Sequence, residues 1–125
     1  MSLDVHLTDE PESVECECSS CGHKHERTVT PELYWANITH NLGRMADAAG
    51  IYKELWRPEE IGITKASQLI EPLRAGLQRL QADPEQFKQY NAPNGWGLYE
   101  HFVPWVQKYL IACEENPDAN VSVSR

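Results

Sequence analysis

The sequence predicts an α+β protein in which a small antiparallel β-sheet is packed against three or four α-helices. Two observations lead to this class. Short stretches that alternate polar and apolar residues lie at both ends of the chain, at 4–7 and 121–124. Between them run segments whose apolar residues recur every three or four positions, as on one face of a helix. Strands at both ends with helices between them are typical of a sheet covered on one side.

The chain is long enough for a single domain with a core of its own. It has 125 residues, of which 41% are hydrophobic, and it contains four Trp and five Tyr. We expect a strand and a metal-binding hairpin at 1–30, a helical body at 31–115 and a terminal strand at 119–125. The sheet would then consist of the N-terminal strand, the hairpin and the C-terminal strand.

The charge and hydropathy of the chain disfavour some cellular locations and some classes of partner. The net charge is −8, from 19 acidic and 11 basic residues, and no basic cluster is available to neutralise phosphates. No apolar run is long enough to span a membrane, and the N-terminus shows no signal peptide. We therefore expect a cytoplasmic protein that binds neither nucleic acid nor membranes. Its partner would be a protein or a small molecule, and its oligomeric state is left open.

A first helix is predicted at 31–49. Thr30 can cap it, Pro31 suits its first position, and Gly50 is a natural left-handed terminator. The apolar residues recur at spacings of three and four, at Tyr34, Ile38, Leu42, Met45 and Ala49.

Three further helical segments are expected. A long one begins near Thr64, and Pro72 inside it predicts a bend or two shorter helices. Asp83 and Pro84 open a brief helix, which a turn-rich loop at 91–97 follows. The last helix, at 98–115, has the broadest apolar stripe and is expected to be the most buried. Cys113 on this stripe is interpreted as a core residue.

A cluster of cysteines and histidines lies at the tip of the predicted hairpin at 14–30. The candidate metal ligands are Cys16, Cys18, Cys21, His23 and His25. Zinc takes about four thiolate or imidazole ligands in a tetrahedron. Clustered cysteines in a chain without an export signal indicate a metal site more than a disulfide framework. We therefore predict a structural zinc ion here, with reduced metal-free thiols and redox chemistry as the alternatives.

Strand geometry brings these ligands together in either of two registers. Facing residues in an antiparallel pair have Cβ atoms about 5 Å apart. With a two-residue turn at 19–20, Cys16 faces His23; with a bulge at Gly22, it faces His25. The sequence leaves open which histidine is the fourth ligand. A filled shell is structural more often than catalytic, because catalysis needs an open ligand position.

A second group of polar residues forms a candidate pocket. Asn37, Asn41 and Arg44 would share one side of the first helix, close to Trp96 in the loop. Asparagine is a poor helix former, so the presence of two asparagines within the predicted helix needs an explanation. We favour a structural role, in which their amides bond the backbone of the loop at 94–97, over a polar ligand pocket. Trp96 is interpreted as a core plug between two glycines, and His40 as solvated.

Several stretches of the chain resemble a family of small uncharacterised proteins encoded in bacteriophage and bacterial genomes. They are 37–45 (N-I-T-H-N-L-G-R-M), 46–52, 55–58, 94–97 (N-G-W-G), Tyr99 and 113–119. The resemblance covers most of the chain, from about Asp4 onward. It implies a phage-related provenance and no assigned activity. It also implies that relatives carry other residues at 16–21, so that the metal would be a local reinforcement.

Three functions remain in contention. The first is a non-enzymatic zinc-binding accessory or interaction protein, since the sequence contains no complete catalytic constellation. The alternative is a metal-dependent hydrolase that uses the zinc cluster or the polar pocket. The third is an oligomeric interaction module, which a large apolar patch around Trp35, Trp56 or Trp105 would indicate.

Overall fold

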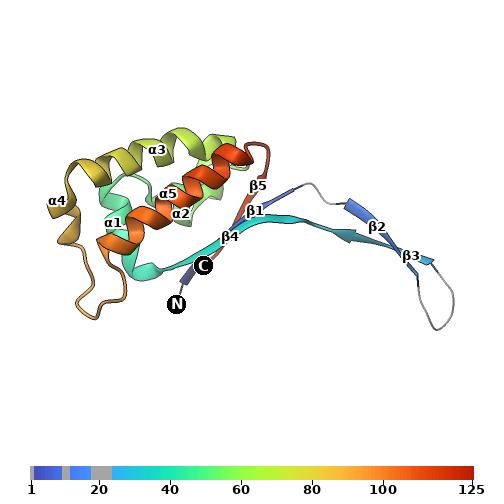
Figure 1. Cartoon of the computed structure of the whole chain (residues 1–125), viewed down its shortest axis with the longest axis horizontal. Coiled ribbons are helices and arrows are strands. Elements are labelled where there is room, and N and C mark those ends of the chain that lie inside the picture. Colours follow the sequence, from blue (N-terminus) through green and yellow to red (C-terminus); the bar gives the residue numbers. More distant parts are fainter. Residues whose placement is uncertain (1, 10–11, 18–23) are drawn as a thin grey trace.

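The computed structural model describes residues 2–9, 12–17 and 24–125 (Figure 1). Within these ranges the strands are β1 (Ser2–Thr8), β2 (Glu12–Glu17), β3 (Lys24–Val29), β4 (Glu32–Thr39) and β5 (Asn120–Ser124). The α-helices are α1 (Gly43–Ala48), α2 (Tyr52–Trp56), α3 (Ser67–Ala82), α4 (Pro84–Lys88) and α5 (Tyr99–Glu115). Two short 3₁₀ helices, η1 (His40–Leu42) and η2 (Pro58–Ile61), complete the set. The α+β class predicted from the sequence is confirmed.

The body of the protein is built on a three-stranded antiparallel sheet with the order β4-β1-β5. The N-terminal strand is therefore central, and the C-terminal strand pairs with it along 120–124. On β1, Leu3, Val5 and Leu7 are fully buried and alternate with partly exposed residues, as a strand with one covered face requires. The sequence correctly indicated both terminal strands.

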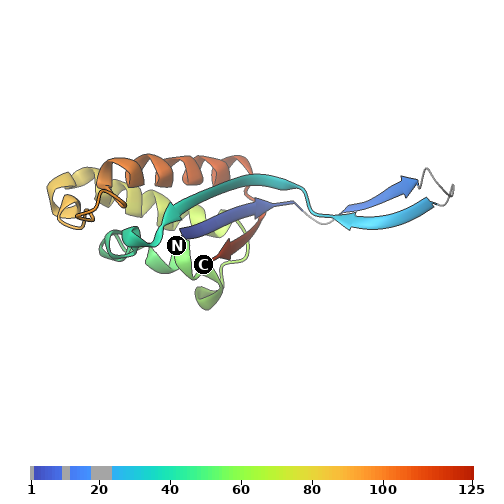
Figure 2. The same ribbon diagram turned by 90° about the horizontal axis from the view of Figure 1, so that it is seen from below.

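The helices cover only one face of this sheet, as the two views in Figures 1 and 2 agree. Helices α3 and α5 pack against each other, and their buried apolar residues belong to the same core as Leu3, Val5 and Leu7 of β1. Tyr109 and Phe102 of α5 are the largest fully buried side chains. Cys113 is also fully buried, which confirms its predicted place in the core.

The predicted hairpin is present, but it forms a sheet of its own. Within the described part of the chain, strands β2 and β3 form a separate two-stranded antiparallel ribbon, from Glu12 opposite Val29 to Glu17 opposite Lys24. This ribbon, called the arm below, projects past the helices at one end of the molecule (Figures 1 and 2). The third strand of the body sheet is β4 instead of the hairpin. The predicted single sheet is therefore wrong in its membership.

The helix predicted at 31–49 is wrong over most of its length. Residues 32–39 form β4, the chain then makes the single turn η1, and only 43–48 are α-helical. A spacing of four is even, so it fits one face of a strand as well as one face of a helix. Ile38, Ala36 and Tyr34 indeed lie opposite Leu3, Val5 and Leu7 of β1. The expected terminator is correct, since Gly50 has a φ of 78°.

The remaining helices follow the sequence more closely. α4 begins at Pro84, and the Asp83 side chain accepts a hydrogen bond from the Gln86 amide. α3 runs without interruption through Pro72, so the prediction of two shorter helices is wrong. Proline removes one backbone bond there, and burial of Leu69, Leu73 and Leu77 on the same helix outweighs that loss. Among the described residues, no helix has both the length and the apolar character needed to cross a bilayer.

Candidate functional site

The arm fixes the relation between two of the five predicted metal ligands. Its register places Cys16 directly opposite His25. This is the second of the two registers that the sequence allows, and it differs from the one in which Cys16 faces His23. Directly opposed positions of an antiparallel pair share a face and have Cβ atoms about 5 Å apart. The backbone therefore brings positions 16 and 25 together.

The other three predicted ligands, Cys18, Cys21 and His23, lie outside the described residues. They belong to the six-residue connection between Glu17 and Lys24. Elsewhere in the described part of the chain, no group of three or more His, Cys, Asp or Glu side chains is close enough to hold a metal ion. The zinc site of the sequence analysis thus stays a prediction for the tip of the arm.

The predicted polar pocket is assembled from three elements instead of one helix. Asn37 belongs to β4, Asn41 to η1 and Arg44 to α1. Asn37 and Asn41 line a surface pocket of about 730 Å³, and Trp96 from the loop between α4 and α5 lines it too. Arg44 does not line this pocket; it lines two neighbouring ones. The loop between α4 and α5, which lines this pocket, lies at the end of the body opposite the arm (Figures 1 and 2).

Asparagine side chains hold the loop of Trp96 in place. The Asn41 amide donates a hydrogen bond of 2.7 Å to the Trp96 carbonyl, and Asn94 Oδ1 accepts one of 3.0 Å from the Trp96 amide. The structural role expected of Asn41 is therefore found in its contact with this loop. Asn37 makes no side-chain hydrogen bond to any described residue, so the same role is not found there.

Trp96 does not plug the core, contrary to the prediction. Its side chain is 70% exposed, whereas the neighbouring Gly97 is buried. Gly97 has a φ of 124°, and a Cβ there would come within 3.0 Å of Asn41 Cβ and 3.5 Å of Leu42 Cγ. The loop thus packs its backbone against η1 at Gly97, which leaves the indole on the outside. Sequence alone cannot tell which residue of a Gly-Trp-Gly turn faces inward.

His40 is also placed differently from the prediction, because it is half-buried instead of solvated. Its Nδ1 accepts a hydrogen bond of 2.8 Å from Trp56 Nε1. An Nδ1 that accepts leaves the ring proton on Nε2. His40 thereby ties η1 to α2, and Trp56 is buried with 3% of its surface exposed.

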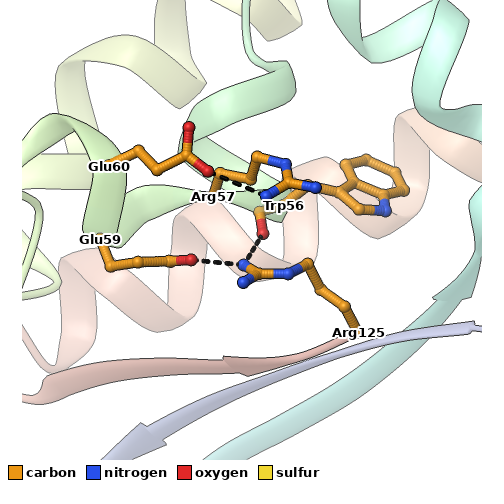
Figure 3. Close-up of polar contacts among 5 residues, drawn as sticks. All are labelled: Trp56, Arg57, Glu59, Glu60 and Arg125. Atoms are coloured by element: carbon orange, nitrogen blue, oxygen red, sulfur yellow. Dashed lines mark hydrogen bonds and ion pairs between the residues drawn. The ribbon is translucent and has the colours of Figure 1, made fainter.

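A cluster of charged residues at the C-terminal end of β5 gave no signal in the sequence (Figure 3). Arg125 donates to the carbonyl of Trp56 at 2.6 Å and pairs with Glu59, while Arg57 pairs with Glu60 at 2.9 Å. Glu60 holds the pKa of Arg57 above its usual value. A backbone hydrogen bond and Arg125 hold the pKa of Glu59 below its usual range. The two contacts of Arg125 join residues 66 and 69 positions apart, so this cluster has a structural role in fixing the C-terminus to the segment after α2.

The tryptophans that would mark an oligomeric patch do not gather in one place. Trp56 is buried, and the indole of Trp105 donates a hydrogen bond of 2.9 Å to the Asn37 carbonyl. Only Trp35 of the three is exposed, at 52%. It lies on the sheet face that the helices leave open, opposite His6. A lone exposed tryptophan there is not the large apolar patch that the interaction-module hypothesis needs.

Comparison with family models, with curated protein sequences and with solved structures finds no match to this chain.

Proposed function

We propose that this protein is a non-enzymatic, zinc-binding interaction protein, whose arm is clamped at its tip by a structural zinc ion. The observation that carries the proposal is the register of the arm, in which Cys16 and His25 are directly opposed. A thiolate and an imidazole position at this separation are two of the four ligands that a tetrahedral zinc needs. Cys18, Cys21 and His23, a few residues further toward the tip, supply candidates for the other two.

The shape of the arm explains why a metal would be useful there. An isolated two-stranded ribbon is at best marginally stable in water. The arm has two six-residue strands, and no helix covers it in either view (Figures 1 and 2). Zinc binding is coupled to folding of the segment that carries its ligands. A zinc ion would therefore supply the stability that the body obtains from its core.

The projecting arm also supports the assignment as an interaction protein. Both edges of a two-stranded ribbon offer unpaired backbone groups, to which an extended segment of a partner can add as a further strand. We propose that the arm binds a protein partner in this way. The proposal includes a bacteriophage or bacterial provenance, for which the sequence resemblance described above is the support.

The test is metal analysis of the reduced, purified protein. We expect about one equivalent of zinc, lost after treatment with a chelator. Cys16→Ser and Cys18→Ser should each lower the bound zinc, whereas Cys113→Ser, the matched control in the core, should leave it unchanged. Zinc removal should make the arm sensitive to protease while the far-ultraviolet circular dichroism of the helices persists.

Two results would count against the proposal. Zinc below about a tenth of an equivalent in carefully prepared protein would remove the metal site. The second result is a spectrum of the cobalt-substituted protein that shows an exchangeable water ligand. It would favour the hydrolase alternative over the structural role, because a catalytic zinc keeps an open position. A cobalt spectrum typical of four sulfur and nitrogen ligands in a tetrahedron, unchanged when anions are added, supports the structural role.

A further inference from the structure

Trp96 is a large, solvent-exposed aromatic side chain on a loop that several hydrogen bonds hold in place. It is the most exposed of the large apolar side chains in the described part of the chain, at 70%. Both of its backbone polar groups are fixed by Asn41 and Asn94, as described above. Two backbone bonds close the loop around it, from the Ala92 amide to the Gly97 carbonyl at 3.0 Å and from the Gly95 amide to the Ala92 carbonyl at 3.1 Å. The indole is thus preorganised for contact with a ligand.

The pocket beside Trp96 is lined by neutral polar groups. Three of the six asparagines of the chain, Asn37, Asn41 and Asn94, line it together with Thr39 and Ser2. None of the described residues that line it is Lys, Arg, Asp or Glu, and His101 at its rim is its one titratable group. In a chain with 24% charged residues, this composition disfavours a charged ligand and favours an uncharged one.

The asparagines retain unused hydrogen-bonding capacity that points to the chemistry of the ligand. An amide side chain offers two donors and an acceptor with two lone pairs. Asn41 uses one donor on Trp96, Asn94 uses its oxygen, and the side chain of Asn37 makes no hydrogen bond to the described residues. Neutral donors and acceptors therefore lie side by side around one aromatic ring.

We propose that this pocket binds a neutral carbohydrate. A sugar ring presents hydroxyl groups, each a donor and an acceptor, along its edge and C–H groups on its faces. The positive C–H groups are attracted to the negative face of an indole, and the hydroxyls match paired amide groups. A pocket of about 730 Å³ holds one or two sugar units. This inference is independent of the zinc-clamped arm, which lies at the other end of the molecule.

The test follows the indole Nε1–H signals of the four tryptophans by nuclear magnetic resonance. Maltose, lactose and N,N′-diacetylchitobiose are titrated to about 20 mM, because a single small pocket of this kind gives a Kd near about 1 mM. We expect at least one disaccharide to shift the Trp96 signal in a saturable way. The zinc-free protein should give the same result, so that failure of this proposal and failure of the metal site are distinguishable.

Matched variants locate the binding. Trp96→Ala should weaken it about tenfold or more, since ring stacking is lost, and Trp96→Phe should recover part of it. Trp35→Ala removes a second exposed indole on the open face of the sheet and should have no effect. Asn37→Ala should weaken binding about threefold. Because Trp96 and Trp35 are both largely exposed, these variants retain the fold, and thermal unfolding checks this.

Three outcomes would overturn the proposal. The first is that no disaccharide shifts the Trp96 signal. The second is that Trp35→Ala weakens binding as much as Trp96→Ala does, which would indicate non-specific contact. The third is that a tetraproline peptide, which also stacks on exposed tryptophans, saturates the pocket when the sugars do not.

Discussion

The two halves of the long β-ribbon show how differently the same backbone pairing can be supported. In the body, β1 and β4 pair under a layer of helices, and Leu3, Val5 and Leu7 are completely buried. In the arm, β2 and β3 continue the antiparallel pairing beyond the helices (Figures 1 and 2). Backbone hydrogen bonds contribute little net stability, because water offers the same bonds to the unfolded chain. Burial of apolar surface therefore stabilises the first half, and the second half needs another source, for which we propose zinc.

The boundary between the halves is visible in the register. Leu7 lies opposite Tyr34 and Thr8 opposite Glu32, so Leu33 is an extra residue on β4. Beyond it, the Asp9 amide donates a hydrogen bond of 2.9 Å to the Pro31 carbonyl, and the described pairing of the arm begins at Glu12 and Val29. A bulge of this kind bends the strand and changes its twist. It marks the point at which the ribbon leaves the core.

The largest expected difference between the arm and the body concerns their cysteines. Burial, with a smaller contribution from Glu114, raises the pKa of the Cys113 thiol to about 12. Its thiolate fraction at pH 8 should therefore be about a thousandfold below that of an ordinary thiol. In zinc-free native protein, Ellman's reagent should titrate the three arm cysteines promptly and Cys113 only after denaturation. Equal rates for all four thiols would contradict this.

The same shift predicts the sign of an alkaline effect. The folded state favours the protonated thiol, so this stabilisation is complete below the pKa of the unfolded thiol, about 8.5. It is lost progressively as the pH rises from there toward about 12. Tyr109 adds to the effect at higher pH, because burial also raises its pKa. The denaturant midpoint should therefore fall above about pH 9, and fall less in Cys113→Ala measured against its own value at pH 7.

The next largest effect compares a truncation in each half. Leu7→Ala should lower the free energy of unfolding by about 3 kcal/mol, because it leaves a cavity beneath the helices. Val14→Ala on β2 should change the unfolding of the body by less than about 0.5 kcal/mol, since no helix packs over the arm. Chemical denaturation followed by the helical signal measures both. A similar loss for the two variants would show that the halves unfold as one unit.

A smaller effect tests how tightly the helical layer is packed. A Cβ added at Gly76 on α3 would lie 2.4 Å from Cγ2 of the buried Ile51. Gly76→Ala gains about 1 kcal/mol of helix propensity but should lose about 2 kcal/mol to overpacking. The net result is a destabilisation of about 1 kcal/mol. In a double-mutant cycle, Ile51→Ala removes the side chain that clashes, so Gly76→Ala should destabilise the Ile51→Ala protein less than it destabilises the original protein. Additive changes in the free energy of unfolding would exclude the clash.

An effect of similar size concerns one hydroxyl group in the core. The Tyr109 hydroxyl is buried without a hydrogen-bond partner among the described residues. The Tyr99 hydroxyl, in contrast, donates a hydrogen bond of 2.7 Å to the Leu80 carbonyl. Tyr109→Phe keeps the stacking on Tyr34 and should stabilise the protein by about 1 kcal/mol. Tyr99→Phe, the matched control, should destabilise it by about the same amount. Thermal unfolding of the two variants should shift in opposite directions.

Local signals predicted the elements that local chemistry decides. The start of α4 at Asp83 and Pro84, the left-handed Gly50 and the broad stripe of α5 are all found where the sequence indicates them. Each depends on residues within one or two turns of the chain. The terminal strands were also predictable, because alternation on β1 and β5 has no helical interpretation.

The segment 32–39 shows where such signals fail. Its apolar positions fit both periods, and the capping residues Thr30 and Pro31 favoured the helix. Pairing with β1, which lies some 30 residues away in the sequence, stabilises the strand instead of a helix. With that change the polar site moved as well, since Asn37, Asn41 and Arg44 no longer share a helix face.

The sequence by itself determined the α+β class, the two terminal strands, the hairpin, the last two helices and the burial of Cys113. Only the tertiary structure decided that β4 is a strand, that Trp96 points outward and that Arg125 reaches Trp56. The physical reason is the range of the interactions. Caps, turns and one-sided apolar stripes act between near neighbours, whereas strand pairing and loop packing depend on which distant surface offers unpaired backbone and room.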